Sequence, residues 1–227
     1  MLLGLNTCGN TASVALGVPG GQQIRIVAQA ELAVRTNSAR LIPEIAAMLE
    51  SRHATLADIE AIVVVNGPGS FTGIRVGLST AKGLAEGGGI PLIAVSRLAF
   101  LAAASGLPHV LAAVDAGRGE YYVGEYRDGD KLGERLLTAE ETIETARQPG
   151  AGVMVCEETA APGTSTACAA LALCGPFYVQ PPDAAEALRF ALARFRAGEF
   201  DDAGTVGANY LRRSDAEVIR SLKAAAQ

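Results

Sequence analysis

The first apolar positions of the chain form the short runs and alternations that are typical of β-strands. Apolar runs cover Leu2 to Leu5 and Ser13 to Val18, and Gln23 to Ala33 alternates polar and apolar residues. Polar turns separate the three segments, among them Pro19-Gly20-Gly21. This pattern predicts three consecutive strands in an antiparallel meander.

Helical periodicity then alternates with buried strands. An amphipathic helix is predicted from about Ser38 to Arg52, with Leu41 and Ile45 on its apolar face. Thr55 to Asp58 resembles a capping box for a further short turn. The β-branched run from Ala61 to Val65 is typical of a strand buried on both faces. We expect the following elements after it: a helix from Ile74 to Glu86, a strand from Pro91 to Val95, and a helix from Arg97 to Ala104 that Ser96 caps.

A similar order of elements begins again after Gly106. The predicted elements are strands at 110–114, 121–126, 131–138 and 152–156, helices at 139–148, 160–174 and 183–196, and a last helix from about Asp215. Asp183 and Glu186 are spaced as a capping box. Both halves open with a strand, a polar turn, a strand, a turn and a strand, which favours a duplicated α/β fold. We therefore expect a first domain at 1–105, a second at 106–204, and a tail at 205–227.

A glycine-rich loop joins the Ala61–Val65 strand to the next helix. Its sequence, Gly67 to Gly77, is neither a Walker A loop nor a dinucleotide fingerprint, because the glycine spacing differs from both. A helix N-terminus behind glycines can hold an anion. The other interpretation is a tight turn without a ligand. The candidate anion contacts in this loop and helix are Gly67, Gly69, Ser70, Thr72 and Arg75.

Small residues recur every fourth position along this helix, at Gly73, Gly77, Ala81 and Ala85. Residues four apart share one helix face, and small side chains let another backbone approach closely. The stripe predicts either packing on the chain's own sheet or contact with a second chain.

Charge, apolar stretches and cysteine content exclude several classes of function. The chain has 227 residues and a net charge of −5, and it contains no basic run that would follow a phosphate backbone or an anionic membrane. No apolar stretch is long enough for a transmembrane helix, and the N-terminus lacks the features of a signal peptide, so we expect a cytoplasmic protein. Neither a Cys-x-x-Cys nor a paired-histidine motif is present, so no metal site is expected. The four cysteines, Cys8, Cys156, Cys168 and Cys174, are expected to be reduced and buried.

Three segments carry a resemblance to a known family. Gly67 to Gly77 resembles the hallmark of the TsaB family, also called YeaZ. Val110 to Tyr122 resembles the opening of that family's second domain, and Tyr210 to Arg213 resembles its C-terminal tail. The resemblance implies an actin-like, sugar-kinase-like (ASKHA) fold of two related α/β domains with mixed sheets.

The resemblance also implies a role in making N6-threonylcarbamoyladenosine at position 37 of tRNAs. In that family the protein is not the catalyst but pairs with a catalytic, metal-carrying paralogue, TsaD, which an ATPase, TsaE, joins. ATP, ADP and metal then belong to the partner subunits, no cofactor is bound tightly here, tRNA is contacted only indirectly, and the unpartnered chain forms a homodimer. Pairing runs through the first domain's helices, which assigns Leu41, Ile45, Gly73, Gly77, Ala81 and Ala85 to the partner interface.

At some positions the residues differ from those expected in a catalytic relative. Asn6 stands where the actin-like fold usually has an aspartate in its first phosphate hairpin, and Glu157 and Glu158 stand where glycines would face an adenosine. Asp115 and Arg118 remain in the second hairpin, so weak nucleotide contact stays open there. A metallopeptidase would need metal ligands that the chain does not supply. The alternative to a non-catalytic subunit is an ATP-dependent enzyme of the same fold, such as a kinase or ATPase.

Overall fold

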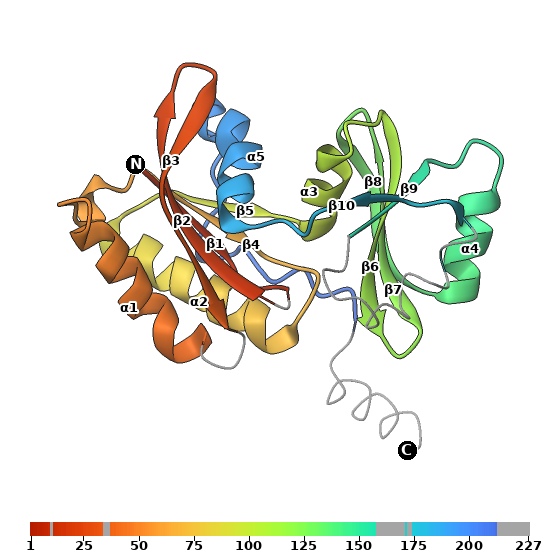
Figure 1. Cartoon of the computed structure of the whole chain (residues 1–227), viewed down its shortest axis with the longest axis horizontal. Coiled ribbons are helices and arrows are strands. Elements are labelled where there is room, and N and C mark those ends of the chain that lie inside the picture. The colour runs from red at the N-terminus through yellow and green to blue at the C-terminus, as the bar shows by residue number, and fades with distance from the viewer. Residues whose placement is uncertain (10, 34–36, 158–170, 172–173, 213–227) are drawn as a thin grey trace.

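Two five-stranded mixed sheets form the framework of the molecule (Figure 1). The computed structural model describes residues 1–9, 11–33, 37–157, 171 and 174–212. The predicted helices at 160–174 and from Asp215 fall largely or wholly outside these residues. Among the described residues, no helix combines the length and the apolar character that crossing a membrane requires.

The first sheet has the strand order β3-β2-β1-β4-β5. Its strands are β1 (Leu2–Asn6), β2 (Thr11–Gly20), β3 (Gln23–Ala33), β4 (Ala61–Val65) and β5 (Leu92–Val95). The first three pair antiparallel, whereas β4 lies parallel to both β1 and β5. The predicted meander and both following strands are therefore confirmed.

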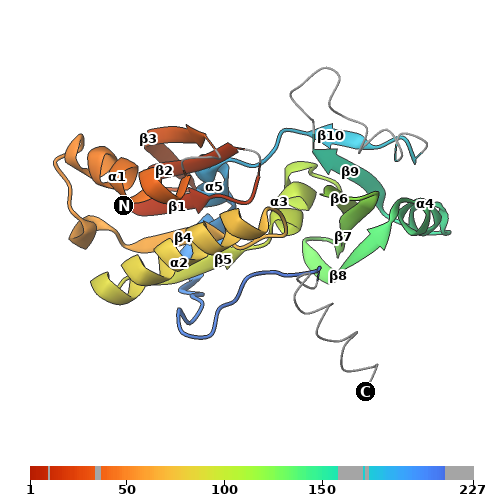
Figure 2. The same ribbon diagram turned by 90° about the horizontal axis from the view of Figure 1, so that it is seen from below.

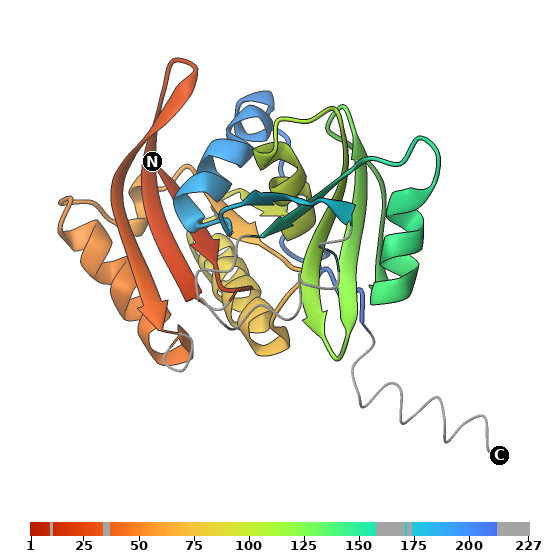
Figure 3. The ribbon, with the colours of Figure 1, turned by 45° about the vertical axis from the view of Figure 1, so that its right-hand side comes forward.

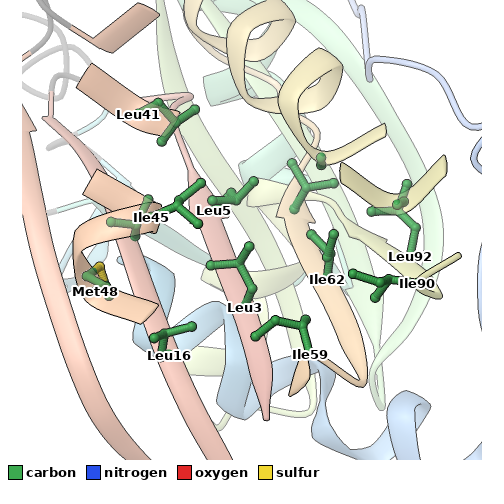
Figure 4. Close-up of a cluster of buried hydrophobic side chains, with 14 of the residues drawn as sticks. Leu3, Leu5, Leu16, Leu41, Ile45, Met48, Ile59, Ile62, Ile90 and Leu92 are labelled. Carbon is green, nitrogen blue, oxygen red and sulfur yellow. The ribbon is translucent and has the colours of Figure 1, made fainter. Parts of the chain in front are cut away.

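Helices cover both faces of this sheet. On one face lie α1 (Asn37–Glu50) and α2 (Phe71–Gly88), and on the other lies α5 (Ala184–Ala197) (Figures 1 and 2). Along β1, Leu3 and Leu5 face α1 and α2, while Leu2 faces α5. Burial on both faces explains why β1 and β4 are apolar without alternation. Figure 4 shows the side chains between the sheet and α1.

The second sheet repeats the topology of the first, in the order β8-β7-β6-β9-β10. Its strands are β6 (His109–Gly117), β7 (Glu120–Arg127), β8 (Asp130–Thr138), β9 (Val153–Glu157) and β10 (Phe177–Val179). Again the first three strands are antiparallel and the last two parallel. The duplicated fold that the two similar openings indicated is confirmed.

The second sheet also has a helix on each face. α4 (Ala139–Arg147) lies on its outer side and α3 (Arg97–Ala104) on the side that faces the first domain (Figure 3). α3 follows a strand of the first sheet yet packs on the second, whereas α5 follows a strand of the second sheet and packs on the first. The expected domain ranges, divided after residue 105, place both helices with the sheet that precedes them in sequence. Their packing differs from that expectation.

Local capping signals are where the sequence predicts them. The Glu186 backbone N–H donates to the Asp183 carboxylate at 2.7 Å, which begins α5. The Thr55 backbone N–H donates to the Asp58 carboxylate at 2.8 Å around the short 3₁₀ helix η2 (Leu56–Asp58). α2 begins three residues earlier than expected, because the Ser70 hydroxyl caps it by accepting from the Gly73 N–H.

Candidate functional site between the two domains

The glycine-rich loop packs against the chain's own backbone. The Ser70 N–H donates to the Cys8 carbonyl at 2.9 Å, and the Arg97 N–H donates to the Gly67 carbonyl at 2.7 Å. A Cβ added at Gly69 would lie 2.3 Å from the Cys8 carbonyl oxygen, so only glycine fits there. The loop therefore forms a tight turn, and contact of this turn with an anion stays a prediction.

The small-residue stripe of α2 faces the same turn. A Cβ at Gly73 would lie 2.0 Å from the Thr7 carbonyl oxygen, and one at Gly77 would lie 2.2 Å from the Thr7 hydroxyl. The Thr7 hydroxyl donates to the Gly73 carbonyl at 2.6 Å. Ala81 and Ala85 are buried in the core between α2 and the sheet. The stripe therefore serves close packing within the chain.

This packing corrects the residues assigned to a partner interface. Leu41 and Ile45 also point into the core, next to Leu3 and Leu5 (Figure 4). All six predicted interface residues are buried by the chain's own sheet and helices: Leu41, Ile45, Gly73, Gly77, Ala81 and Ala85. Spacing alone could not show which side of the helix the small residues would face. A partner on these helices would have to contact their opposite, exposed sides.

Arg75, one of the candidate anion contacts, has partners within the chain. Its guanidinium carbon lies 3.7 Å from the centre of the Phe71 ring, and its Nε donates to the Tyr210 hydroxyl at 2.9 Å. The rings of Phe71 and Tyr210 lie 5.1 Å apart. Thr72 is exposed beside them. Arg75 thus fastens the tail to the start of α2, and nucleotide contact there stays a prediction.

The second hairpin is closed in a similar way. Asp115 accepts from the Gly117 N–H at 2.8 Å, which closes its own turn, and Arg118 has a positive φ of 63°. Arg212 of the tail donates to the carbonyls of Ala116 and Gly117 and pairs with Glu120. The tail therefore contacts both groups of candidate residues. Tyr210 binds Arg75 of the first group, and Arg212 binds the hairpin that carries Asp115 and Arg118.

A buried ion pair joins the domains between these turns, and the sequence did not predict it. Arg97, the first residue of α3, donates from Nε and Nη2 to the two carboxylate oxygens of Glu157 at 2.6 and 2.5 Å. Its Nη1 also donates to the Cys8 carbonyl at 3.2 Å. Burial lowers the pKa of Arg97, but the adjacent Glu157 carboxylate outweighs this and raises it overall. A cation at a helix N-terminus is unfavourable, because it opposes the helix dipole. The position of Arg97 at the start of a helix is therefore the one local sign in the sequence that a carboxylate lies beside it.

Glu134 forms a second link between the domains. Its carboxylate accepts from the Ser96 hydroxyl at 2.5 Å, from the Tyr126 hydroxyl, and from the Asn209 side-chain amide at 2.6 Å. Burial and the hydrogen bond to Glu134 raise the pKa of the Tyr126 phenol. The Asn209 backbone N–H donates to the Asn66 carbonyl at 2.8 Å. The glycine-rich loop, the second sheet and the tail therefore meet at one polar cluster.

Asn6 and the cysteines complete the site. The Asn6 side-chain amide donates to the Pro182 carbonyl at 2.6 Å and its oxygen accepts from the Cys8 N–H at 3.1 Å, so Asn6 holds the loop before α5. Cys8 and Cys156 are buried as expected, whereas Cys174 is partly exposed. Cys168 and Glu158 lie outside the described residues. Within the described residues, no group of three or more His, Cys, Asp or Glu side chains is arranged to hold a metal ion.

Comparison with known proteins places the chain among relatives. Residues 24–217 match the family model described as "TsaD: tRNA N6-adenosine threonylcarbamoyltransferase". The tRNA threonylcarbamoyladenosine biosynthesis protein TsaB of Escherichia coli is 38% identical over 130 residues, which are 56% of this chain and 54% of that protein. TsaB of Bacillus subtilis is 34% identical over 133 residues, 56% of this chain and 57% of that protein. The chain thus spans about half the length of the curated relatives it matches.

A solved structure extends the likeness to nearly the whole chain. YeaZ from Pseudomonas aeruginosa superimposes with a TM-score of 0.72 at 26% identity, covering 92% of this chain and 99% of YeaZ. Together with the two related mixed sheets, this confirms the actin-like fold. The chain therefore belongs to the family that the TsaD model describes, and within it the chain resembles the proteins named TsaB and YeaZ.

Proposed function

We propose that this chain is a subunit of the machinery that makes N6-threonylcarbamoyladenosine in tRNA. The observation that carries the proposal is the family match over residues 24–217, to which the identities with the two TsaB proteins add support. The likeness to YeaZ over almost its full length supports the same assignment for both domains.

The chain's role in this machinery is to support a catalytic TsaD-like paralogue. Two features of the interdomain region favour a non-catalytic subunit over an ATP-dependent enzyme. In the first hairpin, a neutral amide, Asn6, holds the Pro182 carbonyl where an actin-like enzyme has an aspartate. At the end of β9, Glu157 forms a buried ion pair with Arg97 in the region where an adenosine would be expected. A nucleotide would have to break this buried pair to enter.

Pairing uses the exposed sides of α1 and α2, which lie side by side on one face of the first sheet (Figure 2). Ile42 on α1 is 48% exposed, so a partner that covers it would bury a large apolar side chain. Pro43 and Ala46 extend its exposed surface, and Ser79 is exposed on α2. The same surface serves a homodimer when the paralogue is absent.

The catalytic steps belong to the other components. A TsaE-like ATPase joins the pair, and nucleotide and metal are held by these partner subunits rather than tightly by this chain. The chain's net charge of −5 favours only indirect contact with tRNA. The expected cytoplasmic location goes with this role.

A reconstituted modification assay tests the proposal. The reaction contains tRNA, ATP, the TsaD-like and TsaE-like proteins and a source of threonylcarbamoyl-adenylate, and modified adenosine is quantified by mass spectrometry. We expect modification to fall at least about tenfold when this chain is omitted, because the paralogue lacks its support. Modification at an unchanged rate without the chain would contradict the proposal.

Asp115→Ala separates support from catalysis in the same assay. Asp115 closes its own turn and is exposed, so we expect the variant to retain the wild-type rate within about twofold. A loss of several orders of magnitude, with the complex still formed, would instead favour the ATP-dependent enzyme, and titration of the isolated chain with magnesium–ATP would then show whether it binds the nucleotide.

A further inference from the structure

A polar pocket lies on the second sheet, on the same face as α4 and away from the site between the domains. It is an open depression of about 250 Å³. Leu111, Glu125, Arg127, Arg135 and Thr145 line it, together with the loop at 148–151 that leads from α4 to β9.

The strand register explains why charged side chains gather there. In the sheet, Leu111 of β6 pairs with Glu125 of β7, and Val123 of β7 pairs with Arg135 of β8. Leu111 and Val123 belong to the apolar core that α4 covers. Because alternate residues of a strand share a face, Glu125 and Arg127 continue the face of Val123 beyond the apolar core. The pocket is thus the polar end of a face whose other end is hydrophobic.

Among the charged side chains that line the pocket, the carboxylate has a hydrogen-bonding partner within the described part of the chain and the two guanidinium groups do not. Glu125 is the only carboxylate among the described residues that line the pocket, and its Oε1 lies 2.9 Å from Nε2 of His109, so one of its oxygens is occupied. The guanidinium groups of Arg127 and Arg135 make no hydrogen bond or ion pair with the residues that the structure describes, and both residues are exposed. Two guanidinium groups from adjacent strands therefore border one pocket without a direct hydrogen bond to its carboxylate.

We propose that this pocket binds a small oxyanion, the phosphate group of a small molecule, between Arg127 and Arg135. Guanidinium groups match the geometry of phosphate oxygens and hold them through paired N–H donors. The volume lies just below the usual range of about 300–1,000 Å³ for small-molecule sites, which favours a compact ligand. A nucleic-acid backbone would need a continuous basic track, which this acidic chain lacks. The pocket is independent of the proposed function.

Titration of the full-length isolated chain with inorganic phosphate at constant ionic strength tests the proposal. The readout is the change in ¹H–¹⁵N chemical shifts of the Gly150 amide and of the Nε–H groups of Arg127 and Arg135. We expect a saturable shift at these groups, and a loss of affinity of about tenfold in each of the variants Arg127→Gln and Arg135→Gln, since each removes charged donors to the anion. Glu125→Gln should bind phosphate more tightly, because it removes a negative charge from the pocket.

Lys131→Gln is the matched control, since it removes the same charge from β8 but Lys131 does not line the pocket. It should leave phosphate affinity unchanged. A non-saturable shift, or equal losses in Lys131→Gln and Arg135→Gln, would show general charge screening and overturn the proposal. Arginine-dependent binding of tRNA without binding of inorganic phosphate would also overturn it, in favour of a nucleic-acid contact.

Discussion

The guanidinium of Arg97 is held by groups from both domains. Glu157 of the second sheet accepts from two of its nitrogens, and the Cys8 carbonyl of the first domain accepts from the third. The side chains of Arg97 and Glu157 are only 10% and 12% exposed. A charge in such a position is tolerated because its partner is equally buried, so each residue depends on the other.

Arg97→Ala should therefore lower the free energy of unfolding by about 3–5 kcal/mol, because it leaves the Glu157 carboxylate buried without a partner. Urea denaturation measures the change. Arg40→Ala is the control, since it breaks the exposed pair with Glu44 on α1 and should cost less than about 1 kcal/mol. Equal small losses in both variants would show that the buried pair does not stabilise the domain contact.

The buried thiol of Cys8 should make the free energy of unfolding depend on pH, with a defined sign. Burial raises the pKa of its thiol from 9.0 to about 12, and the protonated Sγ donates to the Val65 carbonyl at 3.0 Å. Since the folded pKa is the higher one, this stability is fully present below pH 9 and is lost as the pH rises from 9 towards 12. The free energy of unfolding of the wild type should thus fall more steeply above pH 9 than that of Cys8→Ala. Tyr126, whose raised pKa acts in the same direction, is present in both proteins and cancels in the comparison. Parallel curves would contradict the assignment.

At the scale of the element, α2 has two faces with opposite tolerance to side chains. Gly77 touches Thr7, whereas a Cβ at Gly83 would meet nothing within 4 Å. Gly77→Ala should destabilise the protein by about 1–3 kcal/mol through overpacking. Gly83→Ala should stabilise it by about 1 kcal/mol, because alanine favours a helix. Opposite signs in thermal and urea unfolding confirm the orientation of α2, and equal signs would refute it. Gly77→Leu or Ala81→Arg should unfold the chain rather than break a complex selectively.

The sequence predicts those elements whose cause is local. The apolar runs of β1 and β4, and the Ser96 cap that begins α3 at Arg97, depend on neighbouring residues, and they were predicted almost to the residue. β10 was missed, because its three residues are largely exposed and show no alternation.

Features that depend on distant residues could not be read from local patterns. The face of α2 that carries the small residues is set by Thr7, and Arg97 meets a carboxylate 60 positions away. The packing of α3 and α5 on the opposite sheets likewise follows from long-range contacts. For the same reason the partners of Arg75 and Asp115 within the chain were not foreseen, and anion contact at the candidate residues stays a prediction.

At the scale of the whole molecule, the exchange of α3 and α5 makes the two domains interdependent. The two helices touch through Phe100 and Phe190, whose rings lie 5.8 Å apart edge to face. Glu134 and Glu157 fix the start of α3 from the other side. On the first domain, the sides of α1 and α2 that face away from the sheet stay exposed, at Ile42, Ala46 and Ser79 among others.

That surface carries the prediction on pairing. Ile42→Arg places a charge where we propose the paralogue binds, and Ser79→Arg does the same on α2. Each should weaken the complex at least about tenfold without changing the unfolding of the isolated chain. Leu132→Arg, at an equally exposed apolar position on β8, is the matched control and should pair normally.

The most direct measurement of the central claim is the mass of the mixture with the TsaD-like paralogue, determined by light scattering on a sizing column. We predict a one-to-one complex with the wild type and with Leu132→Arg, and separate proteins with Ile42→Arg. If the wild type and the paralogue remain separate, with or without the TsaE-like protein and ATP, the chain is not the supporting subunit proposed here.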